Sequence, residues 1–300
     1  MKAYILASGV GSRLRPLTER LPKPMVPFMN RPLVSYLLDH VAPHVSETRL
    51  NVSYNRHPLI SYLHGRKRVS HFEEGPMPIG SAKTLYQERN YCGTDLTLVL
   101  CGDLLCNWDI AAMVHFHQQK KALVSVAVRR VPNPQQFGVV VTDPLQRIVS
   151  FHEKPQVPPS SLISCGIYLF SPEVFHNWNV NWKDIGSDVL PALAASKQAI
   201  YAWPMDRAAH WNDIGTIQSY LDAHLHFAGD KNAIASATQV PATAHLHRTV
   251  VGAGAQISPH AHLEECVVWP GATVSAQARL RRAIVLPDRI VEVAPLQLSA

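Results

Sequence analysis

Two basic residues follow a pair of glycines near the start of the chain. The segment Gly9-Val10-Gly11-Ser12-Arg13 comes directly after an apolar run, and Lys23 lies further along in the segment P-K-P-M. Glycines permit a sharp turn whose N–H groups point at a phosphate, and the Arg13 guanidinium matches phosphate oxygens in charge and geometry. Leu14 stands where the dinucleotide-binding fingerprint needs its third glycine, and no P-loop motif is present. The segment therefore indicates a phosphate-binding loop of another kind.

A carboxylate follows the most apolar run of the chain. Residues 96–101 read L-T-L-V-L-C, and Gly102 and Asp103 come next. A carboxylate at the carboxyl end of a buried strand is well placed to bind Mg²⁺ that bridges phosphates. Taken alone, such an aspartate is more typical of a turn or a helix cap.

The first two-thirds of the chain alternates short apolar runs with amphipathic stretches. Strand-like runs occupy residues 3–7, 49–53, 96–101, 123–128, 139–142 and 167–170, and helical patterns occupy residues 32–44 and 81–90. This alternation predicts an α/β fold with a doubly wound, mainly parallel sheet, Rossmann-like in its layout. Such sheets bind ligands beyond the carboxyl ends of their strands, which is where the glycine segment and Asp103 fall.

The last seventy residues follow a different pattern. Aliphatic residues recur in steps of 6, 6 and 5 from Ile234 to Val285, which gives a period of 17 residues. Neither a helix nor an alternating strand has this spacing, whereas a solenoid with three faces per coil does. We therefore predict an α/β domain over residues 1–228 and a three-faced solenoid over residues 229–300.

Composition limits the function classes. The chain has 300 residues, 47% of them hydrophobic, a formal net charge of +6 and five cysteines without a C-x-x-C pair. These values predict a folded protein with anionic partners in a reducing, cytoplasmic compartment. No long basic block and no apolar run of membrane-spanning length occurs, so we expect neither nucleic acid nor a membrane among the partners.

Several motifs together resemble the sugar-1-phosphate nucleotidylyltransferases. Residues 6–18 and 22–25 are similar to the family signature L-A-x-G-x-G-x-R-L-x-P-L-T followed by P-K-P-[ML]. The segments that read F-G-V-V-V, E-K-P, S-C-G-I-Y and W-N-D-I-G-T resemble further family motifs in the same order. Ser164 and Lys83 stand where the family more often has asparagine and a small residue.

The resemblance assigns roles to individual residues. It implies that Arg13, Lys23, Asp103 and Asp213 are catalytic, and that Asp103 and Asp213 bind Mg²⁺. It implies nucleotide binding by Leu6, Gly9, Gly11, Ser12, Arg13, Lys23, Gly80, Ser81 and Ala82. It also implies sugar-phosphate binding by Gly138, Glu153, Lys154 and Gly166, and a left-handed β-helix at the end of the chain.

The implied reaction joins an NTP and a sugar 1-phosphate into an NDP-sugar and pyrophosphate. GTP and mannose 1-phosphate are the leading substrates, because the segments G-S-A, F-G-V-V and E-K-P with a short β-helix look most like the mannose-1-phosphate guanylyltransferase branch. Alternatives are thymidylyl or uridylyl transfer to glucose 1-phosphate, and a non-catalytic regulatory relative. Acyl transfer by the solenoid is disfavoured because no second catalytic constellation is evident.

Two further expectations concern the tail and the histidines. We expect the β-helix to mediate homo-oligomerisation, and we expect the apolar residues 290–298 to form a contact surface. The H-x-H pairs at residues 115/117, 245/247 and 260/262 favour structural or surface histidines over metal ligands, because no partner ligand has recognisable spacing.

Overall fold

The structure of the chain is a computed structural model that describes residues 1–294. It divides by internal contacts into two compact units. The first unit comprises residues 1–10 and 36–211, and the second comprises residues 11–35 and 212–300. The predicted boundary at residues 228/229 separates the α/β part of the chain from the solenoid. It does not coincide with the division by internal contacts, and it stays a prediction. Of the predicted contact surface at 290–298, residues 295–298 lie outside the described residues.

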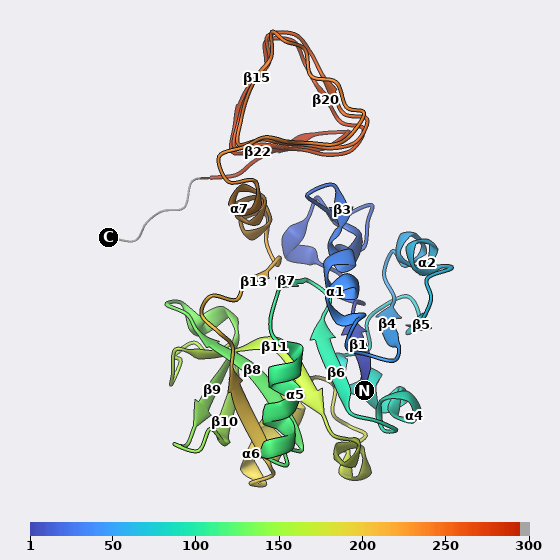
Figure 1. Cartoon of the computed structure of the whole chain (residues 1–300), viewed down its shortest axis with the longest axis vertical. Helices are drawn as coiled ribbons and strands as arrows, with labels where there is room; N and C mark the ends of the chain where they lie inside the picture. Colours follow the sequence, from blue (N-terminus) through green and yellow to red (C-terminus); the bar gives the residue numbers. More distant parts are fainter. Residues whose placement is uncertain (295–300) are drawn as a thin grey trace. The chain divides into compact units, whose positions relative to one another are not determined.

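A nine-stranded mixed sheet forms the centre of the first unit (Figure 1). Its order is β10-β9-β11-β6-β1-β4-β5, with β8 paired to β11 and β12 paired to β8. The pairs β6–β1, β1–β4 and β4–β5 are parallel, whereas β11, β9 and β10 run antiparallel to their neighbours. The strands are β1 (Lys2–Leu6), β4 (Thr48–Val52), β5 (Val69–Glu73), β6 (Thr97–Cys101), β8 (Val124–Arg130), β9 (Gly138–Thr142), β10 (Ile148–Glu153), β11 (Leu162–Phe170) and β12 (Ile200–Pro204).

All six predicted strands are present, and three more were not predicted. The apolar runs read from the sequence correspond to β1, β4, β6, β8, β9 and β11, whereas β5, β10 and β12 went unrecognised. The signals are weak, because β10 alternates apolar and polar residues only over V-S-F-H, and β5 reads V-S-H-F-E without alternation. The predicted doubly wound α/β sheet is confirmed, and its antiparallel half makes it mixed.

Helices connect these strands. The stretch predicted as one helix over 81–90 is α3 followed by α4, separated at Glu88. The side chain of Asp109 caps α5 by accepting a hydrogen bond from the Ala112 N–H at 2.8 Å. The helices are α1 (Leu33–Val41), α2 (His57–Leu63), α3 (Ser81–Gln87), α4 (Arg89–Cys92), α5 (Ile110–Gln119) and α6 (Leu190–Ala195), with a short π-helix at Ile185–Val189. No helix among the described residues is long and apolar enough to span a bilayer.

The second unit joins the glycine-rich segment, a helix and the solenoid. Residues 11–35 contain two 3₁₀ turns and the small hairpin β2–β3, and α7 begins one turn after Asp213. Thr216 and Ser219 form a capping box at the start of α7. These elements are the 3₁₀ turns Ser12–Leu14 and Lys23–Met25, the strands β2 (Pro27–Phe28) and β3 (Arg31–Pro32), and the helix α7 (Ile217–Ala228).

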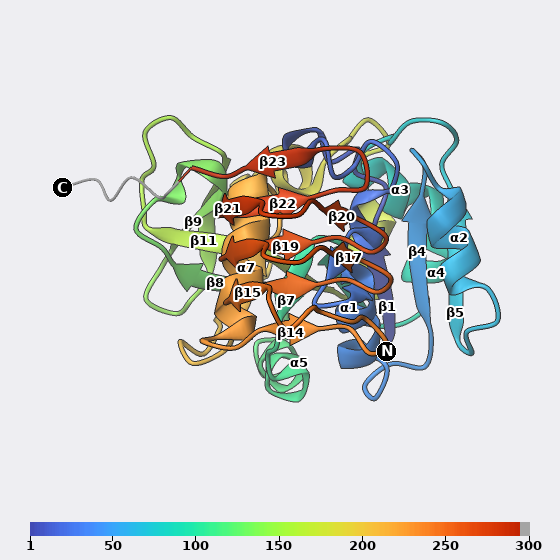
Figure 2. The same ribbon diagram turned by 90° about the horizontal axis from the view of Figure 1, so that it is seen from above.

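The tail is a three-sided parallel solenoid, seen end-on in Figure 1 and from the side in Figure 2. Its registers pair His245 with His262 and His262 with Arg279, which confirms the period of 17 residues. One face stacks β14-β16-β19-β22, and the antiparallel strand β23 covers its last rung. The strands are β14 (Ala233–Ile234), β15 (His245–His247), β16 (Val250–Val251), β17 (Gln256–Ile257), β18 (His262–Glu264), β19 (Val267–Val268), β20 (Thr273–Val274), β21 (Arg279–Arg281), β22 (Ala283–Val285) and β23 (Ile290–Glu292).

Candidate active site

Asp103 lies in the turn that follows β6, at the carboxyl edge of the parallel strands. The Gly102 N–H donates a hydrogen bond to the Leu6 carbonyl at 2.9 Å, and a Cβ on Gly102 would lie 2.8 Å from that oxygen. Glycine therefore lets the turn pack closely against the end of β1, and this contact fixes the half-buried Asp103 beside the start of the glycine-rich segment. Gly166 lies close by, because its Cβ would meet the Cys101 Sγ at 3.0 Å.

Two glycines make room for the carboxylate of Glu153 at the end of β10. A Cβ on Gly138 would lie 3.1 Å from Glu153 Oε2, and a Cβ on Gly186 would lie 2.5 Å from the same atom. The Lys154 Nζ pairs with Glu153 Oε1 at 3.0 Å, and the Lys154 side chain is exposed. The structure thus brings Gly138, Glu153 and Lys154 together, with Gly186 as a neighbour that the sequence motifs did not name.

The start of α3 is tied to the same region through Asp184. The Ser81 hydroxyl donates to Asp184 Oδ2 at 2.8 Å, and the Ile185 N–H donates back to the Ser81 Oγ at 2.9 Å. The Ala82 N–H donates to the Lys183 carbonyl at 2.9 Å, and a Cβ on Gly80 would lie 2.3 Å from that oxygen. Asp184 also caps the turn that contains Gly186, so it links the segment Gly80–Ala82 to the Glu153 carboxylate.

A second polar network holds the segment after β5. The Asn51 Nδ2 donates to Glu74 Oε1 at 2.7 Å and to the Ser8 Oγ at 2.8 Å. The Asn51 Oδ1 accepts a hydrogen bond from the Ala7 N–H at 2.6 Å, and Thr84 donates to Glu74. This network connects the end of β1, where Leu6 and Gly9 begin the predicted phosphate loop, to α3.

In the second unit, the glycine-rich segment packs tightly on itself. Gly11 has a φ of +67°, a left-handed conformation that glycine adopts without strain. The Thr18 hydroxyl donates to the Gly11 carbonyl at 2.8 Å, and a Cβ on Gly11 would lie 2.9 Å from Thr18 Cγ2 and 3.3 Å from Lys23 Cβ. Lys23 is buried, whereas Ser12 and Arg13 are exposed. Gly11 and the Cβ of Lys23 therefore lie side by side, and their binding of phosphate stays a prediction.

Arg13 and Asp213 converge on Gly215. A Cβ on Gly215 would lie 3.1 Å from Asp213 Oδ1 and 3.4 Å from Arg13 Nη2. The absence of a side chain at Gly215 leaves space for both charged groups immediately before the amino terminus of α7. A guanidinium and a carboxylate in this arrangement bind complementary parts of a metal–triphosphate, because one attracts phosphate oxygens and the other attracts the cation.

The predicted site residues thus fall into two sets. The first unit holds Leu6, Gly9, Gly80, Ser81, Ala82, Asp103, Gly138, Glu153, Lys154 and Gly166, and the second unit holds Gly11, Ser12, Arg13, Lys23 and Asp213. Sequence reasoning did not select Asn51, Asp184, Gly186 or Gly215 as site residues. The D-I-G repeat at 184–186 and 213–215 was a possible signal, because aspartate before glycine is typical of a tight, polar turn.

The donor set fits Mg²⁺ bound through its substrate. No cluster of three or more His, Cys, Asp or Glu able to hold a metal occurs within residues 1–294. Mg²⁺ is often bound by only one or two carboxylates together with substrate phosphates, so a single carboxylate such as Asp103 or Asp213 is a sufficient protein ligand. Burial raises the pKa of the nearby Cys165 thiol to about 12 and raises that of Cys106 as well, so neither offers a thiolate.

Three of the six histidines in the H-x-H pairs have local partners. His117 is buried and hydrogen-bonds Ser125 at 2.8 Å and Ser171 at 2.9 Å. The rings of His245 and His262 stack at 4.7 Å between centroids on one face of the solenoid.

Comparison with known proteins shows which family the chain belongs to. Residues 2–229 match the nucleotidyl transferase family, and the chain is therefore a member of that family. Residues 224–297 match the family described as GlmU-like, C-terminal hexapeptide. This second match confirms that the solenoid is a left-handed parallel β-helix.

Three curated relatives illustrate the range of the family. The chain is 36% identical over 243 residues to a UTP–glucose-1-phosphate uridylyltransferase of Synechocystis sp., covering 74% of this chain and 62% of the relative. It is 31% identical to a glucose-1-phosphate adenylyltransferase of Bacillus thuringiensis, covering 77% and 69%. It is 33% identical to the mannose-1-phosphate guanylyltransferase catalytic subunit beta of Xenopus tropicalis, covering 74% and 63%. The chain thus spans less than two-thirds of the Synechocystis relative.

Proposed function

We propose that the chain transfers a nucleotidyl group from an NTP to a sugar 1-phosphate, releasing an NDP-sugar and pyrophosphate. The observation that carries this proposal is the family match over residues 2–229. Charged groups within each unit support it, because Arg13 and Asp213 both approach Gly215 in the second unit, and Lys154 pairs with Glu153 in the first.

The proposed chemistry needs alignment and charge neutralisation. The attacking oxygen belongs to the sugar phosphate, whose second pKa is about 6, so it is ionised at neutral pH without a general base. Glu153 accepts hydrogen bonds from the sugar hydroxyls, and Lys154 binds the sugar phosphate. Arg13 and Lys23 neutralise the triphosphate as the α-phosphate is attacked in line and pyrophosphate departs.

Asp103 and Asp213 are the residues that would hold Mg²⁺. The ion supplies a positive charge that stabilises the phosphate oxygens during transfer. A Mg²⁺ ion with only two protein carboxylates would keep coordination positions for the substrate, so we expect the ion to arrive with the nucleotide.

GTP and mannose 1-phosphate are the substrates that we propose first. The support is the resemblance of Gly80-Ser81-Ala82 and the E-K-P segment to that branch, and the 33% identity with a mannose-1-phosphate guanylyltransferase subunit. Uridylyl, thymidylyl and adenylyl transfer to glucose 1-phosphate are the competing outcomes, since the uridylyltransferase relative is 36% identical and the adenylyltransferase relative is 31% identical. We also propose a cytoplasmic location, which fits the five free cysteines.

A substrate matrix tests the proposal. Each of the common NTPs is combined with mannose 1-phosphate and glucose 1-phosphate, with Mg²⁺ present and pyrophosphate release as the readout. We expect one pair to exceed the others, with GTP and mannose 1-phosphate the fastest. If no pair releases pyrophosphate while the protein still binds nucleotide sugars, a non-catalytic regulatory role replaces this proposal.

A matched pair of substitutions separates the two substrates. Lys23→Met and Lys154→Met each remove one ammonium and keep a side chain of similar length. Lys23→Met is expected to raise KM for the NTP, and Lys154→Met is expected to raise KM for the sugar 1-phosphate, each by at least tenfold. The reverse pattern would show that the two lysines have been assigned to the wrong substrates.

A further inference from the structure

The solenoid reaches the segment that follows Lys23 through two buried side chains. The Trp269 Nε1 donates a hydrogen bond to the Tyr220 hydroxyl at 3.0 Å. The Tyr220 hydroxyl donates in turn to the Pro27 carbonyl at 2.5 Å. Tyr220 is 1% exposed and Trp269 is 8% exposed, so water does not compete for these hydrogen bonds. All three residues belong to the second unit.

Two more contacts hold the same segment. The Met29 N–H donates to His224 Nε2 at 3.2 Å, and the ring of Phe28 packs on His224 with centroids 4.4 Å apart. The Asn30 Nδ2 donates to the Val251 carbonyl of the solenoid at 3.2 Å. Each residue from Pro27 to Asn30 is therefore fixed by α7 or by the solenoid.

The fixed segment is continuous with the predicted phosphate site. Lys23 begins a 3₁₀ turn whose Val26 N–H donates back to the Lys23 carbonyl at 3.2 Å, and Pro27 follows directly. Lys23 in turn packs against Gly11. A displacement of Pro27 would therefore be transmitted through a single turn to the Lys23 ammonium.

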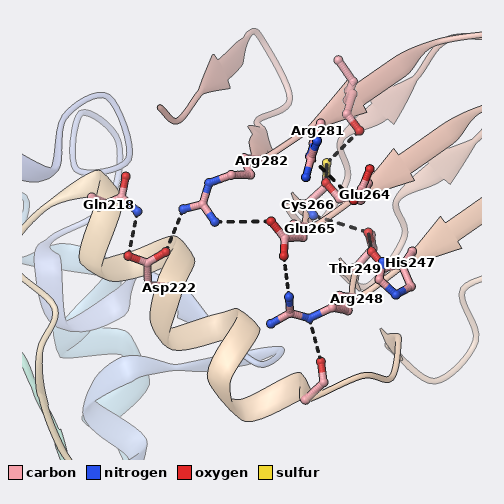
Figure 3. Close-up of polar contacts among 12 residues, drawn as sticks. Gln218, Asp222, His247, Arg248, Thr249, Glu264, Glu265, Cys266, Arg281 and Arg282 are labelled. Atoms are coloured by element: carbon pink, nitrogen blue, oxygen red, sulfur yellow. Dashed lines mark hydrogen bonds and ion pairs between the residues drawn. The ribbon is translucent and has the colours of Figure 1, made fainter. Parts of the chain in front are cut away.

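A separate ion network attaches the solenoid to α7, as Figure 3 shows. The Arg282 Nη2 lies 2.8 Å from Asp222 Oδ1, and its Nη1 lies 3.3 Å from Glu265 Oε2. Glu265 also pairs with Arg248, whose Nε donates to the Gly229 carbonyl at 3.1 Å. Asp222 is two residues from Tyr220, so it projects from another side of the helix. Attachment of the solenoid and contact with Pro27 can therefore be altered separately.

We infer that Tyr220 and Trp269 are positioning residues for the nucleotide site, acting on Lys23 through Pro27. The β-helix is then a structural part of that site in addition to its proposed role in assembly. The assignment of Lys23 to the nucleotide rests on the proposed function, whereas the ordering of residues 22–30 by the hydrogen bonds does not.

Tyr220→Phe and Trp269→Phe test the inference in the full-length protein. Each removes a hydrogen-bonding group and keeps an aromatic ring. Loss of one such bond is expected to raise the Kd for the Mg²⁺–NTP about fivefold, measured calorimetrically with the NTP that turns over fastest. KM for the sugar 1-phosphate should change less than twofold. The double variant should bind the NTP no more weakly than Tyr220→Phe, because both changes interrupt one relay.

Two matched variants serve as controls. Trp178→Phe makes the same change in the core of the first unit, where the indole N–H has no hydrogen-bond partner. Asp222→Asn weakens the attachment of the solenoid without changing the relay. Neither is expected to alter the Kd for the NTP by more than twofold. If Asp222→Asn weakens nucleotide binding as much as Tyr220→Phe, attachment and not the relay is responsible, and the inference is wrong.

Amide hydrogen exchange provides a readout that needs no turnover. Peptides spanning residues 22–32 should exchange faster in Tyr220→Phe and Trp269→Phe than in the parent protein, while peptides from α5 should not change. Unchanged exchange at 22–32 in a folded variant would overturn the inference. A parent protein that turns over no substrate pair would refute the proposed function, and the exchange result would still decide whether the relay orders this segment.

Discussion

At the scale of residues, the candidate site consists of charged side chains that lie beside glycines in tightly packed turns. Glycines at positions 102, 138, 186 and 215 let backbone or carboxylate oxygens approach to distances that a Cβ would forbid. Asp103 follows Gly102 in the chain, Glu153 lies against Gly138 and Gly186, and Arg13 and Asp213 lie against Gly215. The chemistry therefore depends on small residues as much as on charged ones.

Asp103→Asn is expected to abolish turnover and to leave the fold intact. The amide has nearly the same shape as the carboxylate, but it cannot neutralise a divalent cation, and loss of metal-assisted stabilisation of the transition state corresponds to several kcal/mol. Turnover at saturating Mg²⁺ and the melting temperature should be measured together. Normal turnover in Asp103→Asn, or full activity of the parent protein in excess EDTA, would contradict the metal assignment.

Two buried histidines predict how stability depends on pH. Burial lowers the pKa of His117 to about 4 and that of His224 to about 4. In the unfolded chain a histidine has a pKa of about 6.5, so between pH 6.5 and 4 the unfolded state binds more protons and stability falls as the pH falls. Each histidine contributes up to about 1.4 kcal/mol per pH unit to this loss.

Urea unfolding at pH 7 and at pH 5 checks this prediction. His224→Gln should be less stable than the parent protein at pH 7, but it should lose less free energy of unfolding between the two pH values, because glutamine does not titrate. The exposed His226 on the same helix provides the control His226→Gln, which should keep the full dependence on pH. An identical loss in His224→Gln and the parent protein would argue against a neutral, buried His224.

At the scale of elements, the π-helical turn at 185–189 connects two parts of the candidate site. Its cap Asp184 holds Ser81 at the start of α3, and its Gly186 lies against the carboxylate of Glu153. A change in this turn should therefore weaken the binding of both the NTP and the sugar 1-phosphate, although the turn itself is expected to contact neither.

Gly186→Ala is expected to reduce turnover more than it reduces stability. The added Cβ would lie 2.5 Å from Glu153 Oε2, so the carboxylate must move away from its present position. We expect KM for the sugar 1-phosphate to rise at least tenfold, while the melting temperature falls by only a few degrees. Gly254→Ala lies at a solenoid corner where a Cβ meets nothing within 4 Å but φ is +67°, so it is the control for a substitution that strains the backbone away from Glu153. Equal loss for both variants would exclude a specific effect on Glu153.

At the scale of the whole molecule, the solenoid has two proposed roles, assembly and ordering of residues 22–30. Removal of residues 230–300 deletes Trp269 and the Val251 carbonyl, and it uncovers the Tyr220 hydroxyl, which is buried in the full chain. The truncated chain should therefore bind the NTP more weakly, and it should also have a smaller oligomeric state than the full-length protein.

Light scattering coupled to size exclusion measures the oligomeric state. Turnover per active site measures the effect on the nucleotide site. A truncated chain that keeps the full oligomeric state would contradict assembly through the β-helix. Arg282→Met is a milder change, because it removes the ion pairs with Asp222 and Glu265 and keeps the hydrophobic column. It should lower the free energy of unfolding by about 1–3 kcal/mol, and added salt should reduce the difference from the parent protein.

The sequence by itself determined the fold class and the repeat. Apolar runs marked six strands of the sheet, and the aliphatic period of 17 residues marked the solenoid, because burial requires side chains to recur with the geometry of the backbone. Short motifs identified the residues that carry charge, since Arg13, Lys23, Asp103 and Glu153 stand in recognisable local patterns.

Only the tertiary structure decided which residues surround those groups. The closeness of Gly186 to Glu153, the hydrogen bond of Ser81 to Asp184 and the relay from Trp269 to Pro27 join positions far apart in the chain. Local patterns reflect backbone geometry and burial, whereas these contacts depend on how separate elements pack together. No spacing along the chain therefore encodes these contacts, and the proposed role of the solenoid in ordering residues 22–30 rests on the folded second unit alone.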